Sequence, residues 1–270
     1  MTNGIRKTHD FCWINVMTPK ATEARTFFGD LLGWSFDEMP GVPSGKLIRV
    51  GGAARTPADG APGGASAGAL MDLESGGFPP GTPPAIGVLV KVDEVDAAVT
   101  KVESLGGRAE APMDVLENGR MALCTDPTGA IFGLWEPKKQ KGMDVDSHAH
   151  GAPGWYEVLT KDAARAATFY AELFGWEVEE QRPQPDMLYR LFKLDGVPVA
   201  GAMELDEAMG NVPAHWAVSF SVRNADETAR RVTELGGELC IPVGEIPGVG
   251  RFSLLKSPQG VSFHITEWRD

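Results

Sequence analysis

The residues of this chain that could transfer protons lie in its second half. Glu157, His215 and His264 each fall in a short apolar run that is typical of a β-strand. Side chains alternate along a strand, so we expect these three to point to the same side of a sheet. An apolar environment raises the pKa of a carboxyl group, and a nearby imidazole could share its proton near neutral pH. The three residues are therefore candidates for general acid/base catalysis.

Each of these residues also has a purely structural interpretation. A buried carboxylate at Glu157 could be neutralised by Arg251 or by a backbone donor, because acids are rarely buried without a partner. A single histidine on a strand, such as His264, more often has a structural than a catalytic role. The sequence leaves both interpretations open.

Tryptophans accompany the polar residues on the same predicted strands. Trp13 and Trp155 stand two residues before Asn15 and Glu157, so each pair shares one face of its strand. An indole ring can stack on a flat ligand, although a tryptophan in a sheet more often belongs to the core. The candidate ligand-binding residues are Trp13, Asn15, Trp155 and Trp216.

A repeated unit supplies the elements that would position these residues. The segment 26–34 returns 142 positions later as 168–176, and the longer segments 13–34 and 155–176 share 10 identities in 22 positions. A second repeat relates the segment that follows 13–34 to the segment that follows 155–176. Such internal similarity indicates one structural unit used several times.

The same pattern of elements is predicted in every copy: a strand, a helix and three further strands. In the first copy the strand covers 11–17, and Thr18 and Pro19 are the expected N-cap and first residue of the helix. In the second copy Asp162 is the expected cap. Glycines 33 and 175 mark the ends of these two helices. The chain thus contains four predicted βαβββ units.

The units fall into two domains, at 8–137 and 153–270. Residues 138–152 are polar and lack periodicity, so we interpret them as a solvated linker. The first domain carries an insertion rich in glycine, proline and alanine at 51–66, which we expect to be mobile. Its counterpart in the second domain is a short turn.

Composition limits the class of partner. The 270 residues carry a net charge of −12 and have a pI near 4.9, which disfavours binding to nucleic acid or to an anionic membrane. No apolar run approaches the roughly 18 residues of a membrane span. Cys12, Cys124 and Cys240 are odd in number and lack CxxC spacing, so we expect reduced thiols. These features favour a cytoplasmic protein with a small-molecule ligand and leave its oligomeric state open.

The ends of the repeated units resemble those of a known superfamily. They are FFGDLLGW and FYAELFGW after the first helices, LGG after the others, and DPTG and SPQG before the last strands. The chain is similar to tandem members of the vicinal oxygen chelate superfamily, which includes glyoxalase I, extradiol dioxygenases, and fosfomycin and bleomycin resistance proteins. It resembles most the two-domain glyoxalase-like proteins of actinobacteria, some of which are labelled hydroxylases. The resemblance implies an α+β fold in which each pair of βαβββ units forms a curved mixed sheet around a cleft.

Metal-dependent members of that superfamily take ligands from the first and last strands of the two units. The matching positions here are Trp13, Gly87, Gly133 and the vicinity of Ala69 in one domain, and Trp155, Ala217, His264 and the vicinity of Ala202 in the other. Among these residues only His264 can ligate a divalent ion, whereas a catalytic zinc ion takes about three protein ligands. We therefore expect no metal and no cofactor.

The predicted function is a metal-independent enzyme of lyase, isomerase or hydroxylase-like type that acts on an apolar, aromatic small molecule. The second domain should hold the reactive cleft, because the first offers only Asn15, Ala85 and Gly133 at the equivalent positions. One alternative is a protein that sequesters a small molecule or antibiotic. Another is a metal-dependent glyoxalase or dioxygenase.

Overall fold

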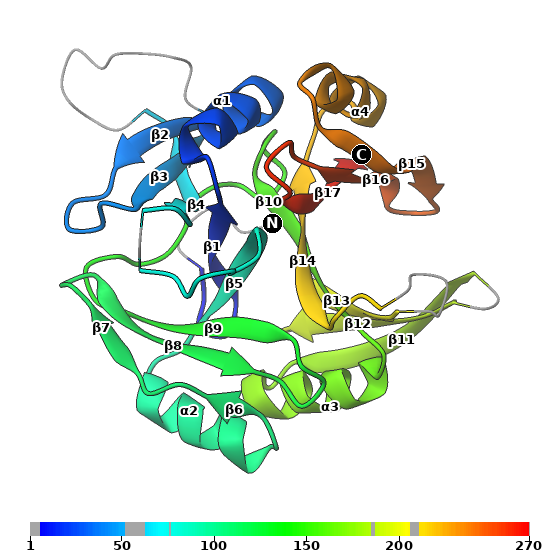
Figure 1. Ribbon diagram of the computed structural model, residues 1–270. Helices are drawn as coiled ribbons and strands as arrows, with labels where there is room; N and C mark the ends of the chain where they lie inside the picture. Colours follow the sequence, from blue (N-terminus) through cyan, green and yellow to red (C-terminus); the bar gives the residue numbers. More distant parts are fainter. Residues whose placement is uncertain (1–5, 52–62, 76, 185–186, 206–210, 270) are drawn as a thin grey trace.

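Each half of the chain forms one curved mixed sheet in the computed structural model (Figure 1). The structure describes residues 6–51, 63–75, 77–184, 187–205 and 211–269. Most of the insertion expected at 51–66 therefore lies outside the described residues.

The first half contains the two predicted units. Its elements are β1 (Phe11–Thr18), α1 (Ala21–Leu32), β2 (Ser35–Glu38), β3 (Gly45–Val50), β4 (Ala65–Asp72), β5 (Ala85–Lys91), α2 (Val95–Ser104), β6 (Arg108–Ala109), β7 (Met113–Val115), β8 (Gly119–Thr125) and β9 (Ile131–Pro137). The strands are ordered β2-β3-β4-β1-β5-β9-β8-β6, and β7 also pairs with β8. The two units join where β1 and β5 pair antiparallel.

The second half repeats this arrangement. Its elements are β10 (Pro153–Thr160), α3 (Ala163–Phe174), β11 (Glu177–Gln184), β12 (Met187–Leu194), β13 (Val197–Glu204), β14 (His215–Ser221), α4 (Ala225–Glu234), β15 (Glu238–Ile246), β16 (Gly250–Lys256) and β17 (Ser262–Trp268). The sheet order is β11-β12-β13-β10-β14-β17-β16-β15, which matches the order of the first sheet except that β7 has no separate counterpart. The predicted tandem α+β fold is confirmed.

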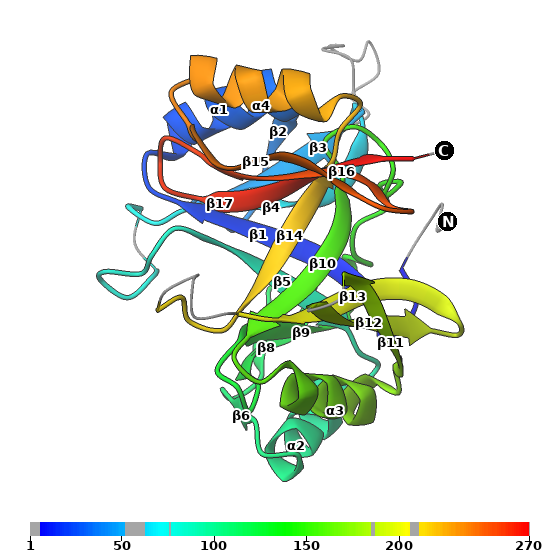
Figure 2. The same cartoon turned by 90° about the vertical axis from the view of Figure 1, so that its right-hand side faces the viewer.

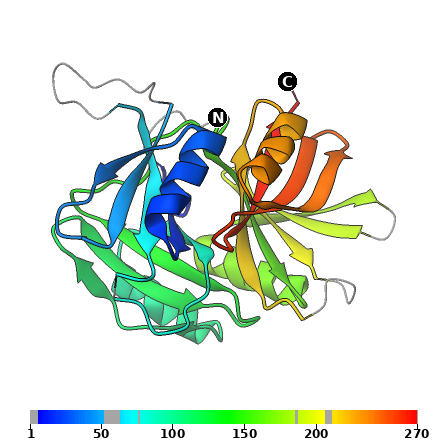
Figure 3. The ribbon, with the colours of Figure 1, turned by 45° about the horizontal axis from the view of Figure 1, so that its top comes forward.

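The two sheets share one core. Helices α1 and α4 lie together at one end of the molecule and α2 and α3 at the other (Figure 2). Phe28 of α1 packs against Phe263 of β17, and Phe169 of α3 packs against Phe132 of β9, so helices of one half cover the sheet of the other. Figure 3 shows the halves side by side, from blue to green in the first and from green through yellow to red in the second. The opposite face of each sheet points away from this core.

One helix cap differs from the prediction. Helix α1 begins at Ala21 rather than at Pro19, and its N-cap is Lys20 in the left-handed region with φ 50°. Thr18 is the last residue of β1, where it is fully buried and its carbonyl accepts a hydrogen bond from the Leu73 amide. That role in the sheet prevents it from capping the helix. The predicted cap of α3 is confirmed, since Asp162 accepts a hydrogen bond from the Arg165 amide at 3.0 Å.

The segment between the halves packs more closely than its polar composition indicates. Met143 and Val145 are buried, and the Trp34 indole donates to the Gly151 carbonyl at 2.7 Å. These apolar side chains are spaced by exposed polar residues, which hides them from a composition argument. No helix within the described ranges is long and apolar enough to cross a bilayer.

Candidate functional site

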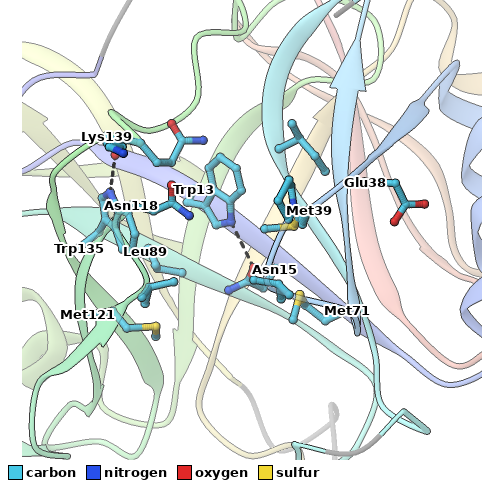
Figure 4. Close-up of a pocket in the computed structure, with 15 residues that line it drawn as sticks. Trp13, Asn15, Glu38, Met39, Met71, Leu89, Asn118, Met121, Trp135 and Lys139 are labelled. Carbon is cyan, nitrogen blue, oxygen red and sulfur yellow. Dashed lines mark hydrogen bonds between the residues drawn. The ribbon is translucent and has the colours of Figure 1, made fainter.

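A cavity of about 420 Å³ lies on the face of the first sheet that points away from the shared core. Its walls are the aromatic and aliphatic side chains of Trp13, Leu47, Met71, Leu89, Met121 and Trp135. Polar or charged residues join them at Glu38, Asn15, Asn118, Lys139 and Gln140. We call this cavity the first cleft (Figure 4). Its size and apolar lining are those of a small-molecule site.

Strand register brings the wall residues to one face. Trp13 of β1 pairs with Leu89 of β5, and Met121 of β8 pairs with Trp135 of β9. Paired residues on neighbouring strands point to the same side of a sheet. Gly133 lies between these two pairs. Because it carries no side chain, nothing projects into the cleft from this position.

The indole N–H groups of both tryptophans in the first cleft donate hydrogen bonds within the protein. The Trp13 indole donates to Asn15 Oδ1 at 3.2 Å, and the Trp135 indole donates to the Gln140 carbonyl at 3.1 Å. Figure 4 shows these two bonds as dashed lines. The bonds hold both rings in place, and each ring lines the cavity with the small part of its surface that is not buried, since Trp13 is 8% and Trp135 6% exposed.

The charged residues that line the first cleft each form an ion pair with a neighbouring residue. Lys139 bonds to Glu117, and Glu38 bonds to Lys46. The Lys139–Glu117 pair is solvent-exposed, so it contributes little to stability. We therefore regard the first cleft as electrically neutral.

The second half holds Glu157 in a different arrangement. Tyr189 of β12 donates its hydroxyl to Glu157 Oε1 at 2.7 Å, and the Trp155 indole donates to the same hydroxyl at 2.9 Å. Loss of hydration raises the pKa of the Glu157 carboxyl, which the bonds from Tyr189 and Trp155 oppose. The sequence predicts Glu157 and Trp155 at this site but not Tyr189, because Tyr189 lies on a strand outside the repeated segments 13–34 and 155–176.

Tyr189 also makes the face of the second sheet that carries Glu157 differ from the equivalent face of the first sheet. Tyr189 pairs with Met203 of β13, as Gly45 pairs with Met71 of β4. Tyr189 therefore stands where the first half has a glycine. Its ring crosses Gly201, where a Cβ atom would lie 1.9 Å from the tyrosine hydroxyl. The ring covers Glu157, whereas in the first half the side chains of Met39, Val42 and Met71 surround Gly45 and Asn15 lines the cavity.

The two candidate histidines lie farther along the second sheet. His264 pairs with Ser219 of β14, which pairs with Trp155. Two strand spacings separate β17 from β10, which is roughly 10 Å. His264 is 7% exposed, its ring lies 4.7 Å from that of Phe252, and burial followed by the charge of His215 lowers its pKa to about 4.

His215 makes a local contact. Its Nδ1 donates to the Pro213 carbonyl at 2.9 Å, since a carbonyl can only accept. The structure thus joins Glu157 to Tyr189 and Trp155, and within the described residues no hydrogen bond links Glu157 to either histidine.

Trp216 does not belong to a cleft. It is 5% exposed, and its indole donates to the Tyr170 hydroxyl at 2.8 Å within the shared core. It follows His215 directly on β14, so alternation places it on the opposite face. We remove it from the candidate ligand-binding residues for that reason.

Arg251 is not the partner of Glu157. It bonds to Asp226 of α4, and Arg120 bonds to Asp96 of α2 in the same way. These equivalent ion pairs tie a helix to a strand in each half. Both arginines have a structural role.

The donor set for a divalent ion of the kind the superfamily uses is incomplete. Within the described part of the chain, no three histidine, cysteine, aspartate or glutamate residues are grouped so that they could hold a metal. In the first cleft, Trp13 and Asn15 face Leu89, Gly87 and Gly133 across the sheet. These residues do not fit such an ion, and we derive no chemistry from one.

Comparison with known proteins is consistent with this fold. The glyoxalase-like domain family matches residues 156–266. The protein named "Putative glyoxylase CFP32" of Mycobacterium bovis is 34% identical over 254 residues, covering 94% of this chain and 92% of its own. The "Anthracycline biosynthesis protein DauV" of Streptomyces sp. (strain C5) is 32% identical over 267 residues, covering 96% and 93%.

Solved structures with lower identity share the architecture. The Mn(II)-bound glyoxalase from Novosphingobium aromaticivorans has a TM-score of 0.63 at 14% identity, covering 97% of this chain and 82% of its own. The 2,2',3-trihydroxybiphenyl 1,2-dioxygenase from Sphingomonas wittichii has a TM-score of 0.64 at 12% identity, covering 97% and 91%. The repeated units, the sheet order and the full-length relatives together show that this chain is a two-domain member of the glyoxalase-like family within the vicinal oxygen chelate superfamily.

Proposed function

We propose that this protein binds a flat, apolar aromatic small molecule in the first cleft. The observation that carries this proposal is the pair of fixed indole rings, Trp13 and Trp135, on the wall of a neutral cavity of about 420 Å³. Aromatic rings favour stacked or edge contacts with other rings. Methionines at Met71 and Met121 add soft, adaptable contacts.

The relatives named for anthracycline biosynthesis support the ligand class. Anthracyclines are flat, polycyclic aromatic compounds, and the two Streptomyces proteins match nearly the whole of this chain. A cavity with apolar walls and few polar groups suits such a ring system.

Equilibrium dialysis against a tricyclic aromatic probe tests this proposal. Met121→Glu places a carboxylate in the wall of the first cleft and should weaken binding about tenfold or more, because an unpaired charge resists burial. Val178→Glu makes the same change at an exposed site on β11 and should bind like the wild type. Equal binding by both variants would contradict the proposal.

Proton transfer in the second half is a second candidate function. The observation that favours it is the half-buried Glu157 carboxyl, whose raised pKa keeps a proton available at higher pH than usual. Together with the Tyr189 hydroxyl, it could exchange a proton with a phenol, enol or epoxide without a metal. His264 would be neutral at pH 7, since burial lowers its pKa to about 4.

Native mass spectrometry of the purified protein would identify a co-purifying ligand for a turnover assay. Glu157→Gln should then slow turnover by roughly 10²-fold if the carboxyl transfers a proton in the limiting step. Binding in the first cleft should be retained. If the ligand stays unchanged with both wild type and variant, the protein sequesters its ligand rather than converting it.

A further inference from the structure

The amide groups of the first cleft have fixed orientations. An indole nitrogen can only donate a hydrogen bond, so the atom of Asn15 that faces Trp13 must be its oxygen. A backbone amide likewise only donates, so the Gln140 atom that receives the Gly142 N–H at 3.2 Å must be Oε1. These assignments follow from the chemistry of the donors and need no hydrogen positions.

The side-chain amide nitrogens of these two residues remain able to donate a hydrogen bond to a ligand. Both oxygens accept bonds from the protein, and within the described part of the chain nothing accepts from Asn15 Nδ2 or Gln140 Nε2. Asn15 is half-buried on the wall of the cavity, beside Trp13 (Figure 4). Its N–H group therefore faces the cavity, where an acceptor on a ligand can replace water as its hydrogen-bond partner.

The other polar groups of the first cleft do not reverse its preference for a ligand that accepts a hydrogen bond. The indole N–H groups of Trp13 and Trp135 are consumed within the protein. Lys139 is a cation and adds a donor rather than an acceptor. Glu38 is paired with Lys46, and Asn118 can turn either side of its amide toward a ligand.

We propose that the first cleft selects flat aromatic molecules that carry a carbonyl oxygen, such as quinones and aryl ketones, and that Asn15 Nδ2 donates to that oxygen. This inference rests on the proposed function, because it specifies the ligand of the same cleft. The second half inverts the arrangement. There Glu157 occupies the position of Asn15 and offers only an acceptor or an acidic proton.

The binding of fluorenone and fluorene distinguishes selection of a carbonyl group from binding of aromatic molecules in general. They share a flat tricyclic skeleton and differ in a carbonyl group against a methylene group. Equilibrium dialysis of the full-length protein should show fluorenone binding about three- to tenfold more tightly, the range expected for one hydrogen bond in a partly buried site. Asn15→Leu should lose that preference and bind fluorene at least as well as the wild type.

A matched change controls for nonspecific effects. Asn211→Leu removes an exposed amide in the second half and should keep the wild-type preference. Equal affinity of the wild type for the two probes would overturn the carbonyl selection while leaving aromatic binding intact. The same holds if Asn15→Leu and Asn211→Leu keep an identical preference. Failure of both probes to bind the wild type would instead remove the proposed function, and the carbonyl selection with it.

Discussion

At the scale of single residues, Glu157 sits in an environment that disfavours its charge. Its pKa is raised in the folded protein, so the native state holds a proton that the unfolded chain has already released between pH 4.5 and the native pKa. Folding stability should fall as pH rises through that window. Glu157→Gln keeps an acceptor for Tyr189 and removes the charge.

The corresponding prediction concerns thermal stability. We expect Glu157→Gln to raise the melting temperature relative to the wild type at pH 7 and to have a smaller effect at pH 4. Melting curves followed by circular dichroism at both values would check this. A variant that is less stable than the wild type at pH 7 would show that the carboxylate is well solvated or paired.

His264 should produce a pH dependence of the opposite sign. Burial lowers its pKa from 6.5 to about 4, so its contribution to stability is present above pH 6.5 and is lost as pH falls toward 4. His264→Phe should flatten the acid limb of the stability curve between these values. Urea unfolding of the wild type and variant at several pH values measures it, and parallel curves would contradict the shifted pKa.

At the scale of elements, the helix caps show what sequence can and cannot predict. Asp162 was predicted as a cap, and its side chain bonds to the Arg165 amide. Thr18 has an equally suitable side chain, yet its place at the end of β1 determines its role. Local patterns identify an element, but the neighbouring strand decides where it begins.

A pair of substitutions tests the contribution of the caps. Asp162→Ala should lower the free energy of unfolding by about 1 kcal/mol, because the first turn of α3 loses a side-chain acceptor. Glu94 occupies the N-cap of α2 without a side-chain bond, so Glu94→Ala should have a much smaller effect. Equal losses measured by urea unfolding would show that the Asp162 bond is unimportant.

Strand register also decides which cleft is open. The repeat at 13–34 and 155–176 predicts the strands and helices of both halves, and strand register puts Trp13 and Asn15 on one face of β1 and Trp155 and Glu157 on the equivalent face of β10. It does not predict that Tyr189 and Gly45 occupy equivalent positions. That equivalence depends on pairing across β12, β13, β3 and β4, whose sequences differ between the halves.

At the scale of the whole molecule, the two halves share one buried core. Asp126 of the first half accepts a bond from the Tyr170 hydroxyl at 3.0 Å, and that hydroxyl accepts from Trp216. All three residues are buried, and the apolar core around them draws on both sheets. We therefore expect the chain to unfold as a single cooperative structure despite its internal repeat.

Removal of the Tyr170 hydroxyl tests this coupling. Tyr170→Phe leaves Asp126 Oδ2 and the Trp216 indole without their shared partner, so it should cost about 1 to 3 kcal/mol of stability. Unfolding should remain a single transition when followed by tryptophan fluorescence and by circular dichroism. Two separate transitions in the wild type would show that the halves fold independently.

The central claim is that the first cleft is the ligand site. A crystal structure of the full-length protein with fluorenone tests it most directly. We expect one molecule in the first cleft, in contact with Trp13 and Trp135, with its carbonyl oxygen within hydrogen-bond distance of Asn15 Nδ2. A structure in which the probe occupies the second half beside Tyr189, and the first cleft contains only water, would contradict the claim.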